Sequence, residues 1–144
     1  MKDVYFSAFY DAVQETKQTS GYTLPVDLEA YVVMLLASFV EKPDFLPKDS
    51  FAESYLKLNP RSTLEAKELG DVCLFVSGIF PTLGKRKNLN KKYYQDIGIS
   101  SYQMVSHKLN ENLFLSLSLH FGFISNYIEL VTHSPTYEHY NPYR

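Results

Sequence analysis

A histidine lies inside a run that alternates apolar residues with small or polar ones. The run is LFLSLSLHFGF at residues 113–123, and the histidine is His120. An imidazole can act as a general base or bind a ligand, because it changes charge near neutral pH and burial shifts that change. Ser116 comes one helical turn earlier and Tyr127 two turns later, so a pocket could include both. The sequence favours a simpler interpretation, in which His120 is a core histidine bonded to Ser116 or a backbone carbonyl.

The chain also contains residues that can bind metals or act as nucleophiles, but their spacing does not match a metal site or a known catalytic motif. Glu129 and His133 are four residues apart at a predicted helix end, yet two ligands are only half of a metal site, and the helix dipole also explains His133. Cys73 is the single cysteine, which excludes an intramolecular disulfide and multi-cysteine metal sites. The chain contains no G-x-S-x-G, no phosphate-binding glycine loop and no H-E-x-x-H. We predict no metal, no cofactor and no catalytic residue, which favours a protein that is not an enzyme.

Five of the fourteen basic residues lie within eight positions, at Lys85, Arg86, Lys87, Lys91 and Lys92. They precede Tyr93, and cations beside aromatic rings can hold a phosphate backbone and stack a base. The rest of the chain has nine basic against sixteen acidic residues, whereas nucleic-acid-binding domains are usually basic as a whole. We therefore predict a solvated loop, or a surface made of these cations and Tyr93 that docks a protein partner, and we rank nucleic acid below both.

Apolar residues at intervals of three and four predict an all-α fold, a single-domain irregular bundle of about six helices. The alternating run belongs to the last of these, because its helical period continues through residue 131 and no other segment alternates as a strand partner would. Ser62 and Glu65 have the spacing of a capping box, and Asp49 or Ser50, and Asn88 or Asn90, can cap two other helices. The predicted helices cover residues 3–18, 25–41, 50–58, 62–80, 91–108 and 113–132.

We expect one helical domain over residues 1–133 and a loosely ordered tail over 134–144. A chain of 144 residues can bury a core without a disulfide or metal. The start of the chain lacks the pattern of a signal peptide. The longest nearly apolar run, at 31–40, is shorter than the 20 or so residues that span a bilayer. These features predict a cytoplasmic protein with no membrane partner.

Small residues form two stripes that could bring helices close together. Gly70, Cys73 and Ser77 are separated by three and four residues in the helix predicted for 62–80, and Gly98 and Ser101 form a second small patch. Glycine inside a helix costs about 1 kcal/mol relative to alanine, so a close neighbour would explain its presence. We predict that these five residues, termed the helix-packing patch, meet face to face.

Three segments carry a resemblance to a known family. They are LGDVCLFVSGIFP at 69–81, followed by basic residues, YYQDIGISSY at 93–102, and AYVVMLLASFVEK at 30–42. In order and spacing they resemble a family of uncharacterised small helical bacterial proteins, although Ile79 stands where that family has an aromatic residue. The resemblance covers about half the chain. It implies a bacterial cytosolic protein and supports pairing of the two central helices, and it brings no activity and no catalytic residue.

Three functions follow in order of preference. The first is a non-enzymatic protein-interaction module whose partner could be a second copy of the chain. The second is a binder of a small apolar or acidic ligand in a pocket between helices, lined by His120, Ser116, Tyr127, Tyr94 and Tyr102. The third is nucleic-acid binding through the basic loop.

Overall fold

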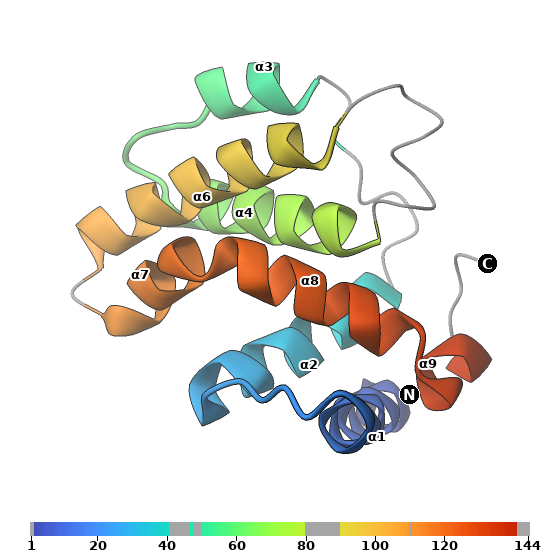
Figure 1. The fold of residues 1–144 in the computed structure, drawn as a ribbon. Helices are drawn as coiled ribbons and strands as arrows, with labels where there is room; N and C mark the ends of the chain where they lie inside the picture. The colour runs from blue at the N-terminus through green and yellow to red at the C-terminus, as the bar shows by residue number, and fades with distance from the viewer. Residues whose placement is uncertain (1, 41–46, 48–49, 80–89, 110, 141–144) are drawn as a thin grey trace. The chain divides into compact units, whose positions relative to one another are not determined.

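The computed structural model describes residues 2–40, 47, 50–79, 90–109 and 111–140, and these ranges contain helices and no strand (Figure 1). The all-α class predicted from the sequence is confirmed. Where the sequence predicts about six helices, the described residues form eight. They are α1 (Lys2–Ser20), α2 (Val26–Val40), α3 (Phe51–Leu56), α4 (Thr63–Gly78), α6 (Lys91–Lys108), α7 (Asn112–Leu119), α8 (Phe121–Thr132) and α9 (Pro135–Tyr140).

Contacts divide the chain into two compact units. The terminal unit takes its residues from 1–45 and 126–144, and the central unit takes its residues from 46–125. Helix α8 contributes to both, with 121–125 in the central unit and 126–132 in the terminal unit.

In the terminal unit, α1 and α2 are joined by apolar packing and by one polar bridge. α1 is followed by Gly21, whose φ of +76° is the left-handed conformation that glycine adopts without strain. Glu29 of α2 accepts hydrogen bonds from Lys17 Nζ at 3.1 Å and from Gln14 Nε2 at 2.8 Å. The most deeply buried apolar side chains of this unit are Phe9, Ala12, Val13, Leu28, Val32, Val33, Leu35, Leu36, Ile128 and Val131.

Residues Pro135–Tyr140 form helix α9, where the sequence predicts a loose tail. Tyr137 is buried, and its ring centroid lies 5.3 Å from that of Phe9 on α1. Glu15 of α1 accepts hydrogen bonds from the backbone N–H and the hydroxyl of Thr136. Six residues are too few to reveal a helical period, so contacts with α1 rather than a local pattern order this segment. The last four residues of the predicted tail lie outside the described residues.

In the central unit, α4 and α6 pair, α3 packs on both, and α7 packs on α6 (Figure 1). Side-chain caps begin three of these helices. Ser50, Ser62 and Asn90 accept hydrogen bonds from the backbone N–H three residues later, at 3.1, 3.3 and 2.9 Å. These three predicted caps are confirmed, and the alternatives Asp49 and Asn88 lie outside the described residues.

The single helix predicted over 113–132 is wrong in one respect. The segment is helical, but it divides at His120 into α7 and α8, whose axes are bent by 77°. His120 has φ −108° and ψ 18°, outside the helical range. The next residue, Phe121, is fully buried, and its ring centroid lies 5.8 Å from that of Tyr102. An apolar period records which side chains are buried, and it does not record a change in the direction of the helix axis.

Candidate functional site

The structure places His120 on the surface at the end of α7. Its link to Ser116 is through the backbone, because the N–H of His120 donates to the carbonyl oxygen of Ser116 at 2.9 Å. Both sequence interpretations, a base in a pocket and a satisfied core histidine, assume a buried imidazole. The side chain is instead exposed.

The three tyrosines assigned to the same pocket are buried core residues. Tyr94 is 2% exposed, Tyr102 0% and Tyr127 2%. Burial raises the pKa of Tyr94, and burial together with the charge of Glu29 raises the pKa of Tyr127 to about 12. Tyr127 belongs to the terminal unit, whereas the other two belong to the central unit. None of the five predicted pocket residues lines either pocket described below.

The described part of the basic cluster makes contacts within the central unit. Lys92 pairs with Asp96 at 3.0 Å, one turn later on α6. The hydroxyl of Tyr93 accepts a hydrogen bond from the backbone N–H of Ala52 at 3.0 Å, and Lys91 is half-buried. The other three predicted cations, Lys85, Arg86 and Lys87, lie outside the described residues.

The glycines of the helix-packing patch lie where neighbouring groups come close. A Cβ atom on Gly98 would lie 2.9 Å from Cβ of Cys73 and 2.6 Å from Cε2 of Phe121. A Cβ atom on Gly70 would lie 2.6 Å from Cδ1 of Tyr102. All three distances are below normal van der Waals contact, so each position excludes a side chain. The structure therefore brings Gly98 against Cys73 and seats aromatic rings at both glycines.

The two serines of the helix-packing patch are buried, and their hydroxyls donate hydrogen bonds to carbonyl oxygens of their own helices. Ser77 Oγ donates to the carbonyl oxygen of Leu74 at 3.0 Å, and Ser101 Oγ donates to that of Ile97 at 2.8 Å. Their hydroxyls are thereby engaged within α4 and α6. The helix-packing patch serves the interior of the central unit, and it offers no opening to a ligand.

Cys73 lies inside that interior with no exposed surface. Burial raises the pKa of its thiol, which disfavours the reactive thiolate. We expect 5,5′-dithiobis(2-nitrobenzoate) to label the native protein at least ~1,000-fold more slowly than the protein in guanidinium chloride, since labelling requires opening of the core. The measurement is the absorbance of the released thiolate over time. Complete labelling of the native protein within minutes would contradict the buried placement.

A buried polar network connects α4 with α6. Asp71 is 9% exposed, and its carboxylate accepts hydrogen bonds from the Tyr102 hydroxyl at 2.7 Å and from Lys67 Nζ at 2.9 Å. Glu65, Glu68 and Asp71 recur at intervals of three in the sequence, which predicts a solvated acidic face, and the structure shows that this is wrong for Asp71. The spacing of four residues between Lys67 and Asp71 indicates their ion pair, because it puts opposite charges on one helix face, but no local signal indicates the burial of Asp71.

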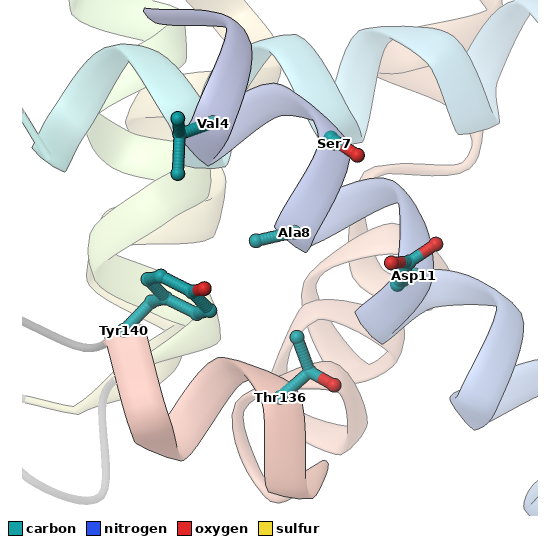
Figure 2. A pocket seen from close by; sticks show the side chains of 6 residues that line it. All are labelled: Val4, Ser7, Ala8, Asp11, Thr136 and Tyr140. Carbon is teal, nitrogen blue, oxygen red and sulfur yellow. The ribbon is translucent and has the colours of Figure 1, made fainter. Parts of the chain in front are cut away.

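The terminal unit contains a pocket of about 580 Å³ between α1 and α9 (Figure 2). Its lining residues are Val4, Ser7, Ala8 and Asp11 of α1 and Thr136 and Tyr140 of α9. Sequence reasoning missed this pocket, because its two walls are more than 120 residues apart in the chain.

The central unit contains a smaller pocket of about 310 Å³ on the side of α3 and α4. Glu65, Glu68 and Lys57 contribute charges of both signs, and Leu69 and Val72 contribute apolar surface. A mixed lining of this kind matches no particular ligand.

Three large apolar side chains are exposed in sequence positions spaced by four. Leu115 is 44% exposed, Leu119 68% and Phe123 47%; we term these three residues the leucine surface. They belong to the central unit and to the two helices that meet at His120. They lie within nine residues of the chain, and large exposed apolar side chains are candidates for an interaction site.

Neither a membrane span nor a metal cluster is found in the described ranges. No single helix there is long and apolar enough to cross a bilayer, and α7 and α8 meet that test only together, as a pair bent by 77°. Within the same ranges, no three His, Cys, Asp or Glu side chains are arranged to hold a metal ion. The half site considered at Glu129 and His133 thus gains no third ligand from the described residues.

No protein-family model, curated protein or solved structure matches this chain. The resemblance to the small helical bacterial proteins therefore stays a prediction.

Proposed function

We propose that the protein is a non-enzymatic interaction module of the bacterial cytosol, and that its partner is a second copy of itself bound through the leucine surface. The observation that carries this proposal is the exposure of Leu115, Leu119 and Phe123 in one short segment. Large apolar side chains on a protein surface lower the free energy when they are removed from water, and a partner can do this.

The charge distribution favours a second copy over a partner of opposite charge. Residues 112–128 contain no Asp, Glu, Lys or Arg, so the leucine surface lies in a segment without formal charge. A two-fold interface brings the same patch of each copy together, and an uncharged patch does so without like-charge repulsion. A partner recognised by charge would find little complementary potential along this segment.

The described residues of the predicted basic docking surface are less suitable for binding a partner than the leucine surface is. Lys92 already pairs with Asp96, and the Tyr93 hydroxyl already accepts a hydrogen bond from the chain. The proposal therefore moves the partner-binding role from the basic loop to the leucine surface.

Sedimentation velocity tests the proposal. We expect a concentration-dependent dimer with a Kd on the order of 100 µM, because three half-exposed side chains per copy make a small interface. Leu119→Lys should weaken the dimer by about tenfold or more, since the two-fold interface loses both leucines and gains two like charges. The far-UV circular dichroism of the monomer should be unchanged, because Leu119 is 68% exposed.

Leu56→Lys is the matched control. Leu56 is also an exposed leucine of the central unit, at 81%, but it lies on α3, outside the leucine surface. This variant should dimerise as the wild type does. A wild-type protein that stays monomeric up to about 1 mM, or equal dimerisation of all three proteins, would overturn the proposal.

A further inference from the structure

Helix α9 forms one wall of the pocket in the terminal unit and α1 forms the other. Helix α9 is held on α1 by the hydrogen bonds from Thr136 to Glu15, and by the ring contact between Phe9 and the buried Tyr137. The aromatic ring of Tyr140 also meets that of Tyr5 edge-on, with centroids 6.3 Å apart. The volume of about 580 Å³ falls within the usual range of small-molecule sites.

The lining of this pocket is divided by chemistry. Val4, Ala8 and the ring of Tyr140 supply apolar surface, whereas Ser7 and Asp11 supply a hydroxyl and a carboxylate (Figure 2). Neither of these two polar groups has a hydrogen-bond or ion-pair partner among the described residues, so both are available to a ligand.

The described lining residues of this pocket carry only negative formal charge. Asp11 carries the only formal charge among the six described lining residues, and no Lys or Arg is among them. Glu15, one turn later on α1, adds a second carboxylate that is already occupied by Thr136. Among the described lining residues, no cation would compensate an anion that approaches these carboxylates, which argues against the acidic ligand considered from the sequence.

We propose that this pocket binds a small organic cation: a primary ammonium group on a short apolar body. The ammonium would donate hydrogen bonds to the Asp11 carboxylate and the Ser7 hydroxyl, which accept them. The apolar body would cover Val4, Ala8 and the ring of Tyr140, which lie together away from Asp11 (Figure 2). The site lies in the terminal unit, so this inference is independent of the leucine surface.

Titration of the full-length protein with n-butylammonium chloride, followed by ¹H–¹⁵N correlation spectra, tests the site. The expected result is saturable shifts of the amides of Ser7, Ala8, Asp11 and Thr136, with a Kd in the millimolar range for so small a probe. Sodium butyrate and 1-butanol are the matched anionic and neutral probes. Each should bind at least about fivefold more weakly, because it lacks the charge that Asp11 attracts.

Asp11→Asn should weaken n-butylammonium binding about fivefold or more and leave 1-butanol binding unchanged. Asp11 is exposed and has no partner among the described residues, so the variant should fold normally. Asp27→Asn is the control, because Asp27 is another exposed aspartate of the terminal unit, outside the pocket, and it changes net charge equally. Equal binding of butyrate and n-butylammonium, shifts scattered away from the pocket, or equal effects of the two substitutions would overturn the assignment.

Discussion

Replacing Gly98 by leucine is expected to lower the free energy of unfolding by about 3 kcal/mol, because the position has no room for a side chain. Even a Cβ atom there would lie 2.9 Å from Cβ of Cys73 and 2.6 Å from Cε2 of Phe121. Both neighbours are fully buried, so neither can move aside without disturbing the core. Glycine costs a helix about 1 kcal/mol relative to other residues, and this opposing gain is smaller than the expected strain.

Urea unfolding followed by circular dichroism measures this effect, and alanine substitutions at two helical glycines provide the control. A Cβ atom on Gly122 would meet nothing within 4 Å. Gly122→Ala should therefore leave the stability equal to or above that of the wild type, whereas Gly98→Ala should be less stable than Gly122→Ala. An unchanged transition midpoint for Gly98→Leu would contradict the close pairing of α4 with α6.

Replacing Tyr102 by phenylalanine is the second substitution with a large expected effect, about 1.5–3 kcal/mol of lost stability. The hydroxyl donates to the Asp71 carboxylate at 2.7 Å, and Asp71 is only 9% exposed. Removing the donor leaves a buried charged acceptor with one partner fewer, which costs more than the loss of a hydrogen bond at the surface. The ring itself is retained, so its packing against Gly70 should survive.

Tyr93→Phe is the matched control, because the Tyr93 hydroxyl accepts an exposed hydrogen bond from the backbone of Ala52. This change should cost less than about 1 kcal/mol. A double-mutant cycle of Tyr102→Phe with Asp71→Asn should give a coupling energy above about 1 kcal/mol, since the two residues are in contact. A coupling energy near zero would show that the network contributes nothing beyond packing.

The spacing of small residues predicted that other groups pack closely against two helices. It did not predict which groups these are, because that depends on segments distant in the sequence. Gly70 and Gly98 indicated that something must approach their helices closely, because glycine is otherwise unfavourable there. That the approaching groups include the rings of Tyr102 and Phe121 depends on the pairing of α6 with α4 and on the bend before α8. Asp71 shares a predicted acidic face with Glu65 and Glu68, which favours solvent exposure, and only the neighbouring helix buries it.

The candidate sites were the least predictable part. The five residues gathered around His120 in the sequence hypothesis occur near helical spacing or share a residue type, but neither property brings side chains to one cavity. The pocket between α1 and α9 joins residues near the two ends of the chain. The helical period through Leu117, Phe121 and Ile124 leaves the leucine surface off the buried face, whereas the exposed fractions of its three side chains came only from the structure.

By itself, the sequence determined the all-α class, the position of α2 within one residue at each end, and the cap at Ser62, and it limited two other caps to two candidates each, among them Ser50 and Asn90. These features depend on backbone hydrogen bonds and capping contacts that act within about one helical turn. Only the tertiary structure decided the break at His120, the order of α9 and the burial of Asp71. Each of those depends on a partner from a distant segment, because burial is set by what packs against a residue and not by its neighbours along the chain.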